Sequence, residues 1–241
     1  MNINLILHKL LRVPTAYDYI KGTLAKADCS LTLDVGCGGF SHLTHFRPAI
    51  TSVGLDVFPQ AIEKAKANGV HDQYIVGDIL MESAEDLLAR AGGRKFDLVM
   101  LYDVIEHLPK RRGYELLEKC EALSSKYVLL QTPNGFLPQG PEFGNEYQRH
   151  LSGWFPHDFE GLGYNVFGAR GTKYLRGYAG GPKFNFPGWM TCDIALASLL
   201  RIRTHPRHAF NLVAIKDVRG VPARMSEPPA IAGGPSSRLD Q

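Results

Sequence analysis

A short apolar run that passes directly into a glycine-rich turn constrains the fold of this chain more than any other feature. The run is Leu31–Val35, and the turn is Gly36-Cys37-Gly38-Gly39. Glycine adopts positive φ without steric cost and lets another group approach the backbone closely. A buried strand that ends in such a turn is typical of an α/β sheet that binds a ligand outside the carboxyl ends of its strands.

Strand patterns and helical patterns alternate from residue 31 to residue 216. Continuous apolar runs such as Leu98–Leu101 and Val128–Leu130 are typical of central parallel strands that helices cover on both faces. The sequence therefore predicts an α/β domain with a mostly parallel sheet. The predicted strands span residues 31–35, 52–56, 73–76, 97–101, 127–131, 164–169 and 210–216, and the predicted helices span 61–66, 84–91, 112–123, 156–162 and 189–202.

The chain of 241 residues is long enough for one large domain with a full core. We expect this domain to cover residues 29–220. Residues 1–28 carry two helical patterns that Pro14 separates. The tail at residues 221–241, rich in Pro, Gly, Ser and Ala, is predicted to be disordered.

Two long irregular segments interrupt the second half of the domain, at residues 136–153 and 171–188. Loops of this length inside a compact domain are usually functional or disordered. Both follow predicted strands, whose carboxyl ends face the ligand in open α/β sheets, so they are predicted to form a pocket and its lid. Their aromatic side chains suit a ring, a sugar face or a lipid: Phe136, Phe143, Tyr147, Trp154, Phe155, Tyr174, Tyr178, Phe184 and Phe186.

Acidic residues stand at the ends of the second and third predicted strands, at Asp56 and Asp78. A carboxylate in the first position can accept hydrogen bonds from both hydroxyls of a ribose, so the layout indicates a nucleotide-like ligand. Taken alone, either aspartate could equally be a helix cap. A dinucleotide-dependent oxidoreductase would need a third glycine at Ser41 and a second catalytic domain, which makes it the weaker interpretation.

Four motifs together resemble those of class I S-adenosylmethionine-dependent methyltransferases, and are similar in particular to those of the ubiquinone-biosynthesis O-methyltransferases. The resemblance implies a Rossmann-like, seven-stranded methyltransferase sheet that is mostly parallel, has an antiparallel last strand and carries helices on both faces. One departure concerns the turn, because many members place a third glycine where this chain has Phe40. The motifs are Asp34-x-Gly36-x-Gly38, Asp56, Gly77-Asp78-Ile79 and Asp103-Val104-Ile105-Glu106-His107-Leu108, within residues 30–170.

The resemblance also implies a site for S-adenosylmethionine at the ends of the first four strands. Asp34 would orient the glycine turn or accept a hydrogen bond from the cofactor amine, and Asp56 would accept from the ribose hydroxyls. Asp78 would meet the adenine amino group. Carboxylates make charge-assisted hydrogen bonds with such donors. The implied cofactor-binding residues are Asp34, Gly36, Cys37, Gly38, Asp56, Val57, Asp78, Ile79, Tyr102 and Asp103.

His107 and His150 are the predicted catalytic residues. Methyl transfer depends mainly on proximity and alignment, but a hydroxyl acceptor must also lose a proton, and histidine can accept it near neutral pH. Alternatively, Glu106 and His107 hydrogen-bond the backbone and His150 caps a helix. In relatives with Glu-x-x-Glu-His this region binds a divalent metal, which would here involve Asp103, Glu106 and His107. The main prediction includes no metal. Four other histidines are predicted to be surface residues: His42, His45, His157 and His205.

The predicted activity is O-methylation of a small-molecule, sugar or lipid-like acceptor, with S-adenosylmethionine as the cofactor. Two alternatives are a metal-dependent RNA ribose methyltransferase and a non-catalytic subunit that binds the cofactor. The net charge of +3 and the lack of a basic patch interleaved with aromatic residues argue against nucleic acid as a partner. The sequence does not indicate the oligomeric state.

The N-terminus lacks the basic region and cleavage site of a signal peptide, and the apolar run Ile194–Leu200 is too short to cross a bilayer. A cytoplasmic protein is therefore predicted, with its four widely spaced cysteines reduced. The helix predicted at 189–202 is amphipathic, and either docks on the sheet or makes a peripheral membrane contact. The basic residues near the C-terminus are interpreted as a solvated face: Arg201, Arg203, Arg207, Lys216 and Arg219.

Overall fold

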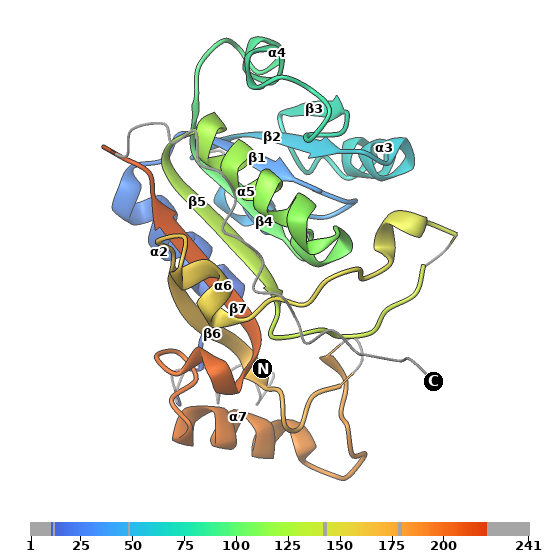
Figure 1. Cartoon of the computed structure of the whole chain (residues 1–241), viewed down its shortest axis with the longest axis vertical. Coiled ribbons are helices and arrows are strands. Elements are labelled where there is room, and N and C mark those ends of the chain that lie inside the picture. Colours follow the sequence, from blue (N-terminus) through green and yellow to red (C-terminus); the bar gives the residue numbers. More distant parts are fainter. Residues whose placement is uncertain (1–10, 12, 48, 142–143, 178–179, 221–241) are drawn as a thin grey trace, which may run out of the picture.

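The computed structural model describes residues 11, 13–47, 49–141, 144–177 and 180–220. It contains a seven-stranded sheet with the strand order β3-β2-β1-β4-β5-β7-β6 (Figure 1). Strand β7 runs antiparallel to the other six strands of this sheet, so the predicted fold class is confirmed. The strands are β1 Leu31–Val35, β2 Thr51–Asp56, β3 Gln73–Val76, β4 Phe96–Tyr102, β5 Ser124–Pro133, β6 Asn165–Thr172 and β7 Ala209–Asp217.

Helices cover both faces of the sheet. The α-helices are α2 Ala16–Ala27, α3 Pro59–Ala67, α4 Ala84–Arg90, α5 Lys110–Leu123, α6 Pro156–Glu160 and α7 Trp189–Leu199. Short 3-10 helices occur at η1 His42–Phe46, η2 Ile105–His107, η3 Glu146–Gln148 and η5 Pro206–His208. None of the described helices is long and apolar enough to span a membrane.

The continuous apolar runs of the central strands arise because both sides of the sheet are buried. On β4, Val99 and Leu101 belong to the cluster that includes α5, whereas Leu98 and Met100 belong to the cluster that includes α2. Successive side chains of a strand point to opposite faces of the sheet. If apolar and polar residues alternated, one of the two faces would have no hydrophobic cluster.

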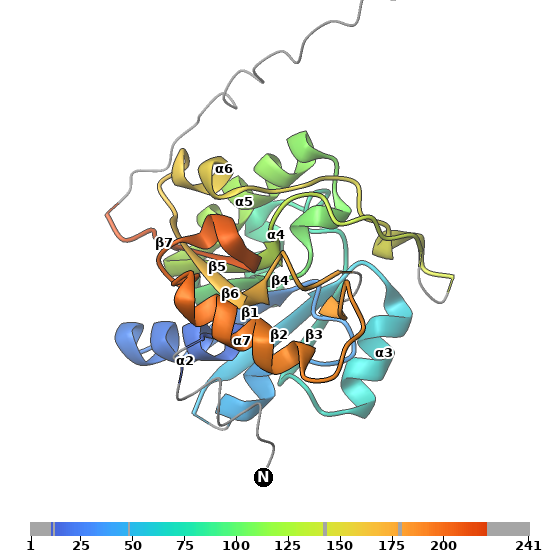
Figure 2. The same cartoon turned by 90° about the horizontal axis from the view of Figure 1, so that it is seen from below.

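Several element boundaries differ from the prediction, and at two of them tertiary contacts or backbone conformation give the reason. Strand β5 continues through Pro133, since β7 pairs with it as far as Asn211. Helix α7 ends at Leu199 and not near residue 202, and Arg201 follows in the left-handed conformation with φ 49°. Figure 2, in which α7 is orange, shows this helix outside the sheet, and it packs against β6.

The second of the two N-terminal helical patterns is α2, which begins after Thr15. The backbone N–H and the hydroxyl of Thr15 both donate to Asp18 Oδ2, at 2.8 and 2.7 Å. The first helical pattern lies almost entirely outside the described residues, as does the predicted tail at 221–241. All four cysteines are unpaired, as predicted.

Candidate active site

The glycine turn after β1 has the close approach that its sequence predicts. Gly36 and Gly38 have φ of +65° and +57°, and the N–H of Gly36 donates to Leu55 O at 2.7 Å. A Cβ atom on Gly36 would lie 2.6 Å from Val104 Cγ2, so only glycine fits there. The departure at Phe40 does not disturb this turn, because that side chain is 72% exposed.

Asp56, at the end of β2, holds the glycine turn in place. Its Oδ2 accepts from Gly38 N and its Oδ1 from Phe58 N, both at 2.9 Å. Val57 lies between these contacts and is partly buried. A carboxylate has about four lone-pair positions, so Asp56 can hold the turn and still accept from the hydroxyls of a ribose.

Asp34 is buried beneath the same turn and accepts a hydrogen bond from Ser41 Oγ at 2.5 Å. This contact supports the prediction that Asp34 orients the turn. Burial raises the pKa of the Asp34 carboxyl to about 7, and the nearby charge of Asp56 acts in the same direction.

His71 is a neighbour of the site that the sequence analysis missed. Its Nε2 lies 3.5 Å from Asp34 Oδ2, and burial lowers its pKa to about 4, so the ring is neutral near pH 7. The ring occupies space beside Gly54, where an added Cβ would lie 2.4 Å from His71 Cδ2. The glycine in the middle of the second strand was the available signal, since such a glycine often marks a close approach.

Asp78 and Ile79 follow β3, as the motif requires. Asp78 is half-buried and its Oδ1 accepts from Leu80 N at 2.9 Å, which fixes the local turn. Ile79 is buried and packs in the core with Ile75. Their predicted contacts with an adenine ring remain predictions.

Asp103, directly after β4, has a strained backbone. Its φ is +52°, which is uncommon for a residue other than glycine and often occurs at functional sites. Its Oδ1 accepts from Gln131 Nε2 at 3.1 Å, and burial raises its pKa to about 6. The preceding residue, Tyr102, is partly exposed at the end of β4.

The two predicted catalytic histidines meet although 43 residues separate them in the sequence. The rings of His107 and His150 pack edge to face, with centroids 4.8 Å apart. The connecting loop folds back on η2, because Leu151 N and Ser152 N both donate to the backbone carbonyl of Glu106, at 2.8 and 3.0 Å. Burial, and secondarily His150, lowers the pKa of His107.

Glu106 lies with these histidines and is 2% exposed. Thr132 Oγ1 donates to its Oε2 at 2.9 Å, while Oε1 has no hydrogen-bond partner among the described residues. Burial, with the charge of Asp103 as a second cause, raises the pKa of Glu106 well above its ordinary value. A buried carboxyl of this kind requires either a proton or a cation.

Glu106, His107 and His150 fit a divalent cation. One potential ligand atom from each lies within 4.8 Å of the others. The Nδ1 atoms of the two histidines contact backbone carbonyls, of Arg149 at 3.2 Å and Leu137 at 2.6 Å. A carbonyl only accepts, so the proton is on Nδ1 and the lone pair on Nε2, as in many metal-binding histidines. The metal alternative from the sequence involved Asp103, Glu106 and His107. In the structure, His150 and not Asp103 lies with Glu106 and His107.

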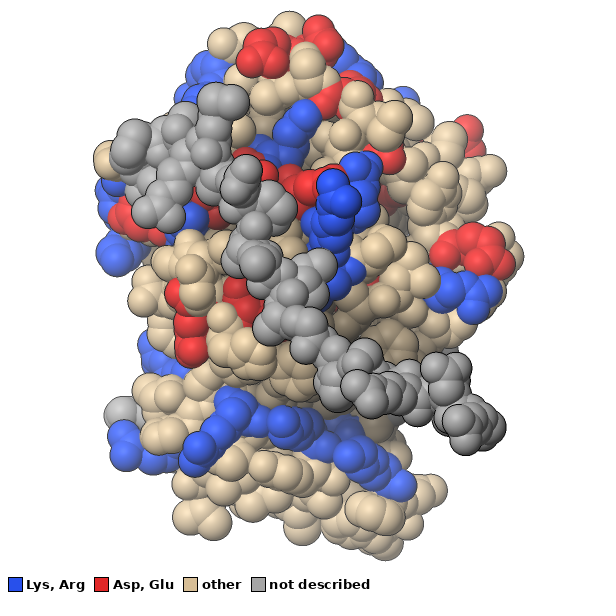
Figure 3. Space-filling model, viewed as in Figure 1, with Lys and Arg blue, Asp and Glu red and all other residues tan. Residues whose placement is uncertain are grey.

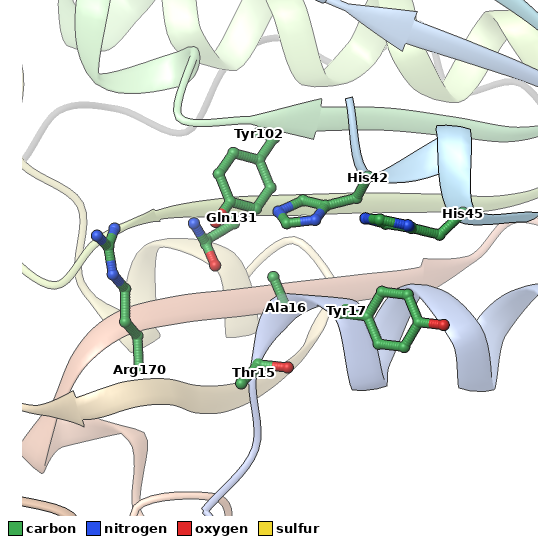
Figure 4. A pocket seen from close by; sticks show the side chains of 8 residues that line it. All are labelled: Thr15, Ala16, Tyr17, His42, His45, Tyr102, Gln131 and Arg170. Atoms are coloured by element: carbon green, nitrogen blue, oxygen red, sulfur yellow. The ribbon is translucent and has the colours of Figure 1, made fainter. Parts of the chain in front are cut away.

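A cavity of about 600 Å³ lies on the other face of β5 (Figure 4). Figure 4 shows Tyr102, Gln131 and His42 along one side, Thr15 and the start of α2 along the other, and Arg170 at one end. Gln131 faces this cavity and Thr132 faces Glu106, because neighbouring residues of a strand point in opposite directions. The lining residues are Thr15, Ala16, Tyr17, His42, His45, Tyr102, Gln131 and Arg170.

Arg170 reaches the cavity from an irregularity in β6. The register with β7 shifts between Ala169 and Thr172, and Arg170 has φ +62°. Irregularities of this kind in a strand change the direction of its side chains, and they occur often beside active sites. Among the described residues, no acidic side chain forms an ion pair with Arg170.

Two sequence-based predictions about ring-bearing residues are wrong. His42 is not a plain surface residue: it is partly buried in the cavity, its ring centroid lies 4.7 Å from that of Tyr102, and burial lowers its pKa. Trp154 does not face a ligand, because it is fully buried and stacks on Phe159 in the core. His45, His157 and His205 are exposed, as predicted.

Comparisons with known proteins identify chains that this one resembles. A family model described as a methyltransferase domain matches residues 33–126. The plantazolicin methyltransferase BpumL in complex with SAH is similar in structure, with 16% identity, a TM-score of 0.51 and coverage of 88% of this chain and 84% of that one. A SAM dependent methyltransferase from Archaeoglobus fulgidus has 19% identity, a TM-score of 0.49 and coverage of 90% and 100%. The curated proteins include no match.

The seven-stranded sheet is thus a Rossmann-like methyltransferase fold, and residues 33–126 carry the match to a methyltransferase domain. The narrower resemblance to the ubiquinone-biosynthesis O-methyltransferases stays a prediction, as do the roles of the individual site residues.

Proposed function

We propose that this methyltransferase methylates a hydroxyl group of a small-molecule, sugar or lipid-like acceptor. The observation that carries the proposal is the cavity lined by Tyr102, at the end of β4, and by His42, which follows the glycine turn in the sequence. An acceptor in this cavity would lie next to the methionyl part of a cofactor held by Asp34, Asp56 and Asp78.

S-adenosylmethionine supplies a methyl group on a positively charged sulfur. The contribution of the protein is then to hold the acceptor oxygen in line with that methyl, because alignment provides most of the reduction in the barrier. Tyr102 and Gln131 would form the wall nearest the reaction. Arg170 would contact the acceptor at the far end of the cavity.

A hydroxyl acceptor also has to lose its proton. His42 lies in the cavity, and its lowered pKa keeps the ring neutral at physiological pH, which is the state that accepts a proton. His107 and His150, the candidates from the sequence, lie beyond Thr132 on the other face of β5. We therefore propose His42 as the base for an acceptor in the cavity, and keep His107 and His150 as the competing proposal.

A methyl-transfer screen tests the function directly. The purified protein is incubated with S-adenosylmethionine labelled on the methyl group and with panels of phenols, sugars, lipids and RNA. Transfer to oxygen of a small acceptor supports the proposal. Calorimetry should show binding of S-adenosylmethionine and not of NAD. Binding of the cofactor without transfer to any panel would instead support a non-catalytic subunit.

A metal-dependent methyltransferase is the second candidate, and the cluster of Glu106, His107 and His150 favours it. These residues would hold a divalent cation that polarises the acceptor hydroxyl, which is the chemistry expected of an RNA ribose methyltransferase of the metal-dependent type. Loss of transfer with a chelator and recovery with magnesium or manganese would select this candidate. Transfer that a chelator does not affect would exclude it.

A further inference from the structure

The segment from Gly161 to Lys216 has an unusual charge composition. It contains eight basic residues and a single acidic residue, Asp193. Asp193 is fully buried, where it pairs with Arg176 at 2.6 Å and accepts from Thr172 N at 2.8 Å. The surface of this segment therefore carries positive charge without acidic residues of its own. The eight basic residues are Arg170, Lys173, Arg176, Lys183, Arg201, Arg203, Arg207 and Lys216.

Most of these basic residues have no acidic partner. Arg176 forms an ion pair with Asp193, and Lys216 forms one with Glu121 at 2.6 Å. Arg170 lines the cavity. Figure 3 shows lysine and arginine in a band across this face, with uncharged surface below it and no acidic residue inside it. Apart from Arg170, the described residues of this segment that are basic and form no ion pair are Lys173, Lys183, Arg201, Arg203 and Arg207.

Helix α7 forms the uncharged surface beside this band. Its inner face packs through Ile194 and Ala197 against Val13. Its outer face exposes Thr191, Cys192, Ala195 and Leu199, which recur at helical spacing and carry no charge.

Two large apolar side chains stand out on this surface. Leu199 is 79% exposed at the end of α7, and Phe184, in the loop before the helix, is 65% exposed. Neither position contributes to the core. An apolar stripe that lies beside a basic band is typical of a surface that meets a partner.

We propose that the outer face of α7, together with the five unpaired basic residues around it, docks on the surface of an anionic lipid bilayer. Apolar side chains of such a helix enter the boundary between headgroups and acyl chains, while lysine and arginine lie against lipid phosphates. A nucleic acid would explain the charge but not the uncharged outer face of α7 with its exposed leucine. Since no described helix can span a membrane, the contact is peripheral.

Co-sedimentation with lipid vesicles tests this surface on the complete chain. The protein should sediment with vesicles of phosphatidylcholine that contain phosphatidylserine, and remain in solution with vesicles of phosphatidylcholine alone. The variant Arg201→Glu/Arg203→Glu should lower the partition coefficient by at least about tenfold, because each basic residue near an anionic surface contributes. Leu199→Asp should also release the protein.

A matched control distinguishes an effect of this particular surface from an effect of the net charge of the protein. Arg94→Glu/Lys95→Glu makes the same change in net charge in the exposed turn between α4 and β4, at the opposite end of the molecule in Figure 1. This control should sediment like the unmodified protein, and all variants should keep their affinity for S-adenosylmethionine. Equal loss in both double variants would overturn the proposal. So would tighter binding to a single-stranded RNA than to anionic vesicles at the same ionic strength.

Discussion

The carboxyl edge of the sheet consists of two halves that the sequence builds in different ways. In the half formed by β1, β2 and β3, Asp34, Asp56 and Asp78 each accept a hydrogen bond from a residue two to seven positions further along the chain. In the half formed by β4, β5 and β6, the groups come from distant parts of the chain, and the cavity joins Ala16, Gln131 and Arg170. The first half is thus a set of local motifs, and the second is a product of tertiary structure.

This difference also separates the two ligands that a methyltransferase must bind. The local motifs form the proposed site of the donor, whose chemistry is the same throughout the class. The cavity forms the proposed site of the acceptor. If the division is correct, changes in one half should affect one ligand and leave the other nearly unchanged.

The largest effect is expected from His42→Gln. Turnover should fall by about 10²–10⁴-fold, because general-base assistance is of that order, while the affinity for S-adenosylmethionine stays the same. In the unmodified protein, turnover should be constant near neutral pH. It should fall only as the pH drops through a value below the ordinary pKa of histidine, since burial lowers the pKa of His42 and the base must be unprotonated.

The variants His107→Gln and His150→Gln are the matched controls for this experiment. Full activity in both is expected if the acceptor occupies the cavity. If turnover falls in either variant but not in His42→Gln, the acceptor binds on the other face of β5 and the assignment of the cavity is wrong.

Gly36→Ala tests whether the donor half depends on the close approach at the turn. The free energy of unfolding should fall by about 3 kcal/mol, because the new Cβ meets Val104 and the residue has positive φ. Gly38→Ala is the control: it has a similar φ but open space for a Cβ, so a loss of about 1 kcal/mol is expected. Denaturant unfolding of both variants measures the difference, and equal losses would show that the contact with Val104 is unimportant.

Asp56→Ala should weaken the binding of S-adenosylmethionine by about 2 kcal/mol, roughly 30-fold, through the loss of charge-assisted hydrogen bonds. Calorimetry measures this affinity, and the KM of the acceptor should change little. Asp56→Asn keeps the shape and one acceptor oxygen, so its effect should be smaller. Unchanged binding in both variants would mean that Asp56 stabilises the glycine turn but does not contact the cofactor.

The smallest effect concerns Arg170→Gln in the acceptor half. The KM of the acceptor should rise by about tenfold, as expected for the loss of one charged hydrogen bond. The affinity for S-adenosylmethionine should not change. A loss of cofactor affinity instead would place Arg170 on the carboxylate of the donor, and the two halves would no longer be separate.

The same division explains what the sequence could predict. Apolar runs predicted every strand of the sheet, and Gly36 and Asp56 were singled out because each stands at the end of such a run. His42 was missed because its partner, Tyr102, is sixty residues away. Trp154 was misplaced because an aromatic residue in an irregular segment carries no signal of its burial. The meeting of His107 with His150 required the loop to fold back on η2, which no local pattern specifies.

The two hydrogen bonds that Asp56 accepts have a consequence for the kinetics of the donor. They are internal to the protein, so the shape of the glycine turn does not depend on a ligand to impose it. A preorganised site loses little conformational entropy when it is filled. We therefore expect S-adenosylmethionine and its demethylated product to associate with this turn in a single step, without a preceding conformational change.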